Sequence, residues 1–133
     1  MQRVLQWACG IALAAALSCA PAAAENYPSR NVEIVVAYGA GGSTDFVART
    51  VAQKLSEALG QTFVIINRPG ASGTIGLLNA MRAKPDGYTL FVGYTSETVV
   101  LPQISKTATY SAIDDFEPIA VTGLVPVVLM VSK

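Results

Sequence analysis

The order of the apolar stretches in the middle of the chain constrains the fold more than any other feature. Residues 32–38, 63–67 and 88–93 are short runs dense in β-branched and aromatic residues, which favour buried strands. Between them, residues 44–59 carry apolar positions at helical spacing with polar residues on the other face, and residues 75–83 predict a shorter helix. This alternation predicts an α/β fold with a parallel sheet, right-handed crossovers and helices on both faces.

The ends of these elements carry their own signals. Ser43 is predicted as the N-cap of the first helix, with Asp45 in its positive first turn, and Gly60 is predicted to end it. Two further strands are predicted near the end of the chain, at residues 119–121 and 125–131.

The first two dozen residues have the pattern of a secretory signal peptide. Arg3 precedes an unbroken apolar run over residues 7–17, and residues 22–24 form a small-residue cleavage site. The run is too short to span a bilayer. Residues 1–24 therefore predict export, with the periplasm as the destination, and lipid attachment at Cys19 is an alternative.

Composition excludes several kinds of chemistry in the exported part. Both cysteines, Cys9 and Cys19, lie in the signal segment, and the chain has no histidine, so neither a disulfide nor a site built on His or Cys is expected. Without Arg3, eight cations remain against nine anions, a net charge of about −1. No basic patch indicates nucleic acid, and no metal or cofactor is expected.

Three loops follow the three predicted strands, at residues 39–45, 68–74 and 93–97, and all are rich in Gly, Ser and Thr. In an open parallel sheet ligands bind beyond the carboxyl ends of the strands. Free N–H groups at a helix N-terminus attract an anion, glycines let the backbone approach it closely, and hydroxyls can donate to a carboxylate. The sequence predicts a small-anion site with Tyr38 as its apolar wall, although the same residues could simply make tight turns and caps.

Rival motifs fit poorly. The first loop has no lysine for a phosphate-binding Walker loop, and Thr44 stands where a dinucleotide fingerprint needs Gly or Ala. An exported enzyme with Ser43 or Ser96 as nucleophile remains an alternative, but the sequence shows no base for it. We therefore expect a protein that is not an enzyme.

The charged residues near these loops are expected to be structural. Asp86, Asp114 and Asp115 read as turn or surface carboxylates, and Asp45 as a helix-start residue rather than a ligand or base. Arg68 could neutralise a bound carboxylate, but pairing with a local acid is the expected role.

The same residues carry a family resemblance. The most specific blocks are Asn67-Arg68-Pro69-Gly70 followed by Gly73, and residues 85–88 (PDGY), supported by residues 41–45 (GGSTD). The whole exported part resembles the N-terminal region of Bug-type receptors, the periplasmic solute-binding subunits of tripartite tricarboxylate transporters. The resemblance implies a two-lobed α/β receptor that closes on a small organic carboxylate, holds it mainly by backbone amides and bridging water, and delivers it to membrane permease subunits.

Carried over by position, the resemblance assigns ligand-binding roles in all three loops. The residues are Tyr38, Gly41, Gly42, Ser43 and Thr44 in the first loop, Ala71, Ser72 and Gly73 in the second, and Tyr94, Thr95 and Ser96 in the third. One departure lies in the second loop, where Ser72 stands in place of a common glycine and could add a hydroxyl or slightly stiffen the loop.

Length is the larger departure, because members of the family are more than twice as long. The resemblance divides the chain into a signal peptide (1–24), the first α/β lobe (25–124) and the start of a crossover into a missing second lobe (125–133). We therefore expect a monomeric, truncated receptor that binds weakly or not at all by itself. The alternative is a degraded fragment without independent binding activity.

Overall fold

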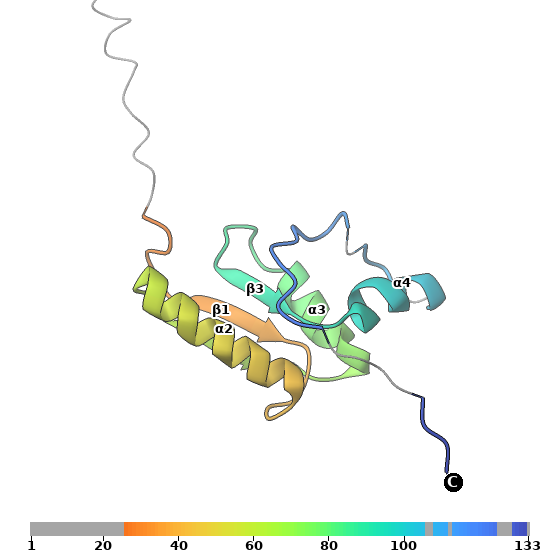
Figure 1. The fold of residues 1–133 in the computed structure, drawn as a ribbon. Coiled ribbons are helices and arrows are strands. Elements are labelled where there is room, and N and C mark those ends of the chain that lie inside the picture. Colours follow the sequence, from red (N-terminus) through yellow and green to blue (C-terminus); the bar gives the residue numbers. More distant parts are fainter. Residues whose placement is uncertain (1–25, 106–107, 112, 125–128, 133) are drawn as a thin grey trace, which may run out of the picture.

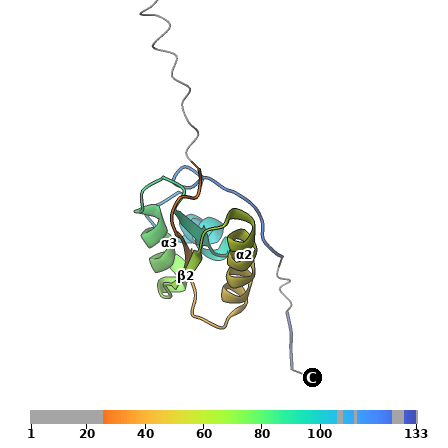
Figure 2. The same ribbon diagram turned by 90° about the vertical axis from the view of Figure 1, so that its left-hand side faces the viewer.

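The computed structural model describes residues 26–105, 108–111, 113–124 and 129–132. Its core is a parallel sheet of three strands, β1 (Val32–Val36), β2 (Phe63–Asn67) and β3 (Thr89–Val92), in the order β2-β1-β3. Helix α2 (Ser43–Leu59) connects β1 to β2, and α3 (Thr74–Met81) connects β2 to β3. The two helices cover opposite faces of the sheet (Figures 1 and 2). The predicted α/β class, parallel sheet and helix placement are confirmed.

Strand β1 lies at the centre of the sheet, which explains why all of its residues except the exposed Glu33 are apolar. Ile34 pairs with Ile65 of β2 on one side and with Leu90 of β3 on the other. Because alternate residues face opposite sides of a sheet, a strand covered on both faces needs no polar positions in its middle. Val35 and Ile34 are each only 1% exposed.

The main core cluster lies between the sheet and α2. It joins alternate residues of β1 to small residues of α2 and the first residue of β2: Val32, Ile34, Val36, Ala48, Ala52 and Phe63. The alanines let α2 lie close to the sheet. On the other face α3 contributes Leu77, which is fully buried.

Element boundaries differ from the predictions by a residue or two. Gly60 ends α2 in a left-handed conformation with φ 69°, as predicted, and its N–H donates to the Ser56 carbonyl at 3.0 Å. The second loop contains a short 3₁₀ turn, η1 (Ala71–Gly73). The third loop is more helical than expected, because a π-helical turn η2 (Ser96–Val100) leads directly into α4 (Leu101–Ile104).

Residues 119–121 form no strand, and neither do residues 129–131 of the second predicted strand. Residues 125–128 of that prediction lie outside the described residues, as does the predicted signal peptide. Ile119, Val121 and Leu124 are 80%, 82% and 91% exposed. Residues with high β propensity form a strand only against a neighbour, and these side chains face solvent instead. Among the described residues, no helix has the length and apolar character needed to cross a membrane.

Candidate functional site

Three loops leave the carboxyl ends of the three parallel strands at the same edge of the sheet. Loop 1 (residues 37–42) follows β1, loop 2 (68–73) follows β2, and loop 3 (93–95) follows β3. Because β1 lies between β2 and β3, loop 1 sits between the other two. We call this edge of the sheet the loop rim.

Loop 1 leads into helix α2, whose N-terminus lies at the loop rim and has no side-chain cap. The N-cap of α2 is Gly42, with φ −80° and ψ 173°, and no side chain caps the helix. The prediction that Ser43 is the N-cap is wrong by one residue, because the Ser43 hydroxyl instead pairs with the Tyr94 hydroxyl of loop 3. The N–H groups of the first turn have no acceptor within the helix, and the helix dipole adds partial positive charge there.

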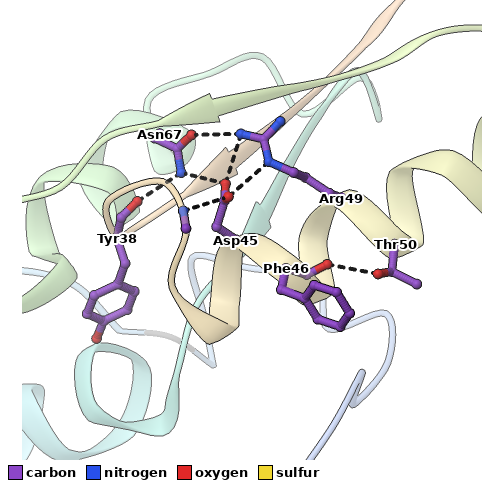
Figure 3. Close-up of polar contacts among 7 residues, drawn as sticks. Tyr38, Asp45, Phe46, Arg49, Thr50 and Asn67 are labelled. Atoms are coloured by element: carbon purple, nitrogen blue, oxygen red, sulfur yellow. Dashed lines mark hydrogen bonds and ion pairs between the residues drawn. The ribbon is translucent and has the colours of Figure 1, made fainter.

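The Asp45 carboxylate stabilises loop 1 through hydrogen bonds and an ion pair (Figure 3). It is 3% exposed, and its carboxylate accepts from the Gly41 N–H at 2.9 Å and from Asn67 Nδ2 at 3.0 Å. Arg49 donates to the two oxygens through Nε at 2.9 Å and Nη2 at 3.1 Å. These donors, with Arg49 the strongest, hold the pKa of Asp45 well below its usual range, and Asp45 in turn raises the pKa of Arg49.

The same network ties loop 1 to the end of β2. Asn67, the last residue of β2, also donates to the Tyr38 carbonyl at 3.0 Å (Figure 3). Asp45 is the helix-start residue that the sequence predicted, and its oxygens are occupied by these internal donors. It shapes the rim from inside the fold.

Loop 2 has an unusual backbone. Ala71 and Ser72 have φ 47° and 53°, and Gly73, the N-cap of α3, has φ 90°. The left-handed region costs a residue with a side chain free energy, and such residues cluster at functional sites. Ala71 and Ser72 are exposed, and α3 also begins without a side-chain cap.

Gly76 of α3 lies close to the backbone of both loop 1 and loop 2. A Cβ atom at this position would lie 2.8 Å from the Ala37 Cα and 2.9 Å from the Arg68 carbonyl oxygen. Only a glycine lets α3 approach both loops this closely.

Loop 3 is organised by Glu97, a residue to which the sequence analysis gave no role. Glu97 is fully buried. One carboxylate oxygen accepts from the Tyr38 hydroxyl at 2.7 Å and the Ser96 hydroxyl at 2.6 Å, and the other accepts from the Tyr94 N–H. A carboxylate directly after a hydroxyl-rich loop was the only sequence signal, and it does not reveal burial.

Two tyrosines join loop 1 to loop 3. The rings of Tyr38 and Tyr94 meet edge to face, with centroids 5.4 Å apart. Burial raises the pKa of Tyr38, whereas hydrogen bonds from Ser43 and Thr44 lower the pKa of Tyr94. Tyr38 therefore joins loop 1 to loop 3 through its ring and through its hydroxyl.

The predicted site residues all lie at the loop rim, but only some of them touch one another. Tyr38 contacts Ser96 and Tyr94, and the side chains of Ser43 and Thr44 both hydrogen-bond Tyr94. The remaining predicted residues contribute backbone or exposed positions: Gly41, Gly42, Ala71, Ser72, Gly73 and Thr95. Thr44 is 6% exposed, so its side chain belongs to the support of the rim.

Charged side chains elsewhere are accounted for by other contacts. In the described part of the chain the ion pairs are Arg30–Asp86, Arg49–Asp45 and Lys54–Glu57, so the expected pairing of Arg68 with a local acid is not found. Asp86 is a turn carboxylate, as predicted, because it accepts from the Tyr88 N–H at 3.0 Å.

An open depression of about 660 Å³ lies away from the loop rim, at the opposite edge of the sheet. Its lining includes Arg30, Lys84 and Tyr88. Within the described ranges no group of His, Cys, Asp or Glu side chains could hold a metal ion.

A parallel sheet that presents glycine- and hydroxyl-rich loops and uncapped helices at one edge defines the class of α/β solute-binding lobes. Residues 47–133 match the Tripartite tricarboxylate transporter family receptor, and the chain belongs to this family. The predicted Bug-type resemblance is thereby confirmed.

Among known proteins, the chain is similar to a UPF0065 protein of Bordetella bronchiseptica, with 47% identity over 117 residues that cover 88% of this chain and 35% of that protein. It is similar in structure to the periplasmic binding protein BugD, with a TM-score of 0.65, 41% identity, and coverage of 69% of this chain and 30% of BugD. It is also similar to MatC of Rhodopseudomonas palustris with bound malate, with a TM-score of 0.66, 36% identity, and coverage of 69% and 31%. The chain thus spans about a third of the length of these proteins.

Proposed function

We propose that the chain supplies one wall of the cleft of a periplasmic receptor, which captures a small organic carboxylate for the permease of a tripartite transporter. The observation that carries the proposal is that the N-termini of α2 and α3 both lie at the loop rim and that neither has a side-chain cap. The backbone donors there can hold an anion without a cationic side chain. Membership in a receptor family and the malate bound to MatC support this reading.

The roles of the predicted residues within this proposal follow from their contacts. The first-turn N–H groups of Ser43 and Thr44 and the exposed backbone of Ala71 and Ser72 are the proposed donors to the carboxylate. The Gly41 N–H donates to Asp45, so Gly41 shapes loop 1 instead of donating to the ligand.

The organisation of the chain is part of the same proposal. Residues 1–24 direct export, residues 25–124 form the first lobe of a monomeric receptor, and residues 125–133 begin a crossover toward a second lobe. Because one wall preorganises a ligand less well than two, we expect the 133-residue chain alone to bind more weakly than a two-lobed receptor.

A hybrid receptor allows the test to be made with two walls. Residues 26–111 replace their counterpart in MatC, and calorimetric titration measures the affinity for di-, tri- and aromatic carboxylates. Ser43→Pro removes one backbone donor at the first helical position, where proline is tolerated, and the extended conformation of Gly42 suits a residue before proline. Ser43→Ala is the matched control, because it removes the hydroxyl and keeps the N–H.

We expect Ser43→Pro to bind the best carboxylate about 10-fold more weakly than Ser43→Ala, since a hydrogen bond to a charged group contributes about 1.5–3 kcal/mol. Equal affinities of the two variants would show that this N–H does not hold the ligand. If the hybrid bound no carboxylate at all, the proposed function itself would be wrong.

A further inference from the structure

Glu97 is a buried acid beside a site proposed to bind an anion. Within the described part of the chain none of the ion pairs includes it. Its surroundings are the hydroxyls of Tyr38 and Ser96 and the N–H of Tyr94. These groups can all donate, which is what an ionised carboxylate needs, because it can only accept.

This arrangement fixes the direction of two hydroxyl protons at the loop rim. A hydroxyl has one proton, and those of Tyr38 and Ser96 are both directed to the same buried oxygen of Glu97, at 2.7 and 2.6 Å. The two hydroxyl oxygens lie 3.1 Å apart and partly face solvent. The hydroxyl oxygens of Tyr38 and Ser96 therefore present only lone pairs to a ligand. This part of the loop rim, the Tyr38–Ser96 corner, can accept hydrogen bonds but cannot donate them.

Glu97 itself is held in place from two further sides. The Tyr110 hydroxyl donates to the Glu97 backbone carbonyl at 2.6 Å. Gly73 of loop 2 lies so close that a Cβ there would come within 3.0 Å of the Glu97 carboxyl carbon. The side chain cannot turn outward to meet a ligand, and it acts through the hydroxyls that it orients.

We propose that Glu97 is a positioning residue that determines specificity, because it makes the Tyr38–Ser96 corner a subsite for a hydrogen-bond donor on the ligand. This inference rests on the proposed function. The ligand class that fits is a small carboxylate bearing a hydroxyl or ammonium group, with the carboxylate at the helix N-termini and the donor at this corner. A second carboxylate at the Tyr38–Ser96 corner would face the lone pairs of the two hydroxyl oxygens and the negative charge of the buried Glu97. The repulsion between these like charges would disfavour binding of such a ligand there.

Malate and succinate test the inference because they differ by one hydroxyl group. In the hybrid receptor, Glu97→Gln places an amide that can donate, so one hydroxyl can accept from it and turn its own proton outward. The malate-to-succinate affinity ratio should fall by about 2- to 13-fold, since one ordinary hydrogen bond contributes about 0.5–1.5 kcal/mol. Glu57→Gln, on the outer face of α2 where Glu57 pairs with Lys54, removes the same charge and should leave the ratio unchanged.

Tyr38→Phe provides a second variant that keeps Glu97 and removes one acceptor, and it should weaken the binding of malate more than that of succinate. Circular dichroism melts of the 133-residue chain check that each variant folds. If Glu97→Gln or Tyr38→Phe weakens both ligands equally, Glu97 is only structural and the inference is overturned. If the unsubstituted hybrid binds neither ligand nor any other carboxylate, the proposed function fails, and that outcome is distinct from an unchanged ratio.

Discussion

Replacing Gly76 with alanine should push α3 away from loops 1 and 2 and destabilise the fold. The added Cβ would lie 2.8 Å from the Ala37 Cα, whereas carbon atoms pack at about 3.5–4.0 Å, so the structure is too tight by about 0.7 Å. The second contact, 2.9 Å to the Arg68 carbonyl oxygen, is also with backbone. No side-chain rotation can relieve either contact, and the helix itself has to move.

The size of the effect follows from two opposing contributions. Overpacking costs about 1–3 kcal/mol, and the upper end applies because both neighbours are backbone atoms. Alanine is more favourable than glycine inside a helix by about 1 kcal/mol, and Gly76 lies within α3. The net loss in the free energy of unfolding should be about 2 kcal/mol, which lowers the Tm of a domain of this size by about 8–16 °C.

Gly39→Ala is the matched control because it makes the same chemical change in open space. Apart from its chain neighbours, no atom lies within 4 Å of the Cβ position at Gly39, and its φ is not in the left-handed region. This variant should be stabilised by about 0.4–1 kcal/mol, because alanine restricts the unfolded chain. Urea unfolding followed by circular dichroism measures both variants. If Gly76→Ala is as stable as the unsubstituted chain, the close approach of α3 is not what positions the loops.

Two further predictions concern the supports of the rim. Because the pKa of Asp45 is lower in the folded chain than in the unfolded chain, its ionised form stabilises the fold above a pH of about 4, and this stabilisation is lost as the pH falls further. Asp45→Asn should therefore lower the urea midpoint of unfolding at neutral pH, and the difference between the variant and the unsubstituted chain should become smaller in acid. If that difference in urea midpoint did not change with pH, the charge assigned to Asp45 would be contradicted. Ser72→Gly should raise the free energy of unfolding by about 1 kcal/mol, since glycine adopts φ 53° without the cost that a side chain brings, and a lower urea midpoint would refute this.

The strands and the two long helices were predictable because their signals are local. The β-branched residues of β1 and β2, and the spacing of Ala48 and Ala52 in α2, report burial directly through the pattern of the sequence. Gly60 likewise ends α2 because the left-handed cap suits glycine.

The features that the sequence did not reveal depend on contacts across the fold. Ser43 has every property of an N-cap, yet its hydroxyl bonds to Tyr94, which is distant in sequence. Glu97 reads as a loop carboxylate, and only the tertiary structure shows that Tyr38 and Gly73 close around it. The apolar residues 119–121 read as a strand, but pairing partners decide whether a strand forms, and a local pattern cannot supply them.

In the proposed receptor, the two buried acids would let a rim that attracts anions also discriminate among them. Asp45 lies behind loop 1, where Arg49 offsets its negative charge and internal donors occupy its oxygens. Asp45 therefore does not cancel the partial positive charge at the N-terminus of α2. Glu97 has no such cation in the described structure, and it makes the region around Tyr38 and Ser96 unfavourable for negative charge. In the proposed receptor a carboxylate is therefore directed toward the space between the N-termini of α2 and α3, and the rest of the ligand extends past the tyrosines. In this proposal the attraction would come from backbone dipoles, and the orientation would come from a buried acid that the ligand does not touch.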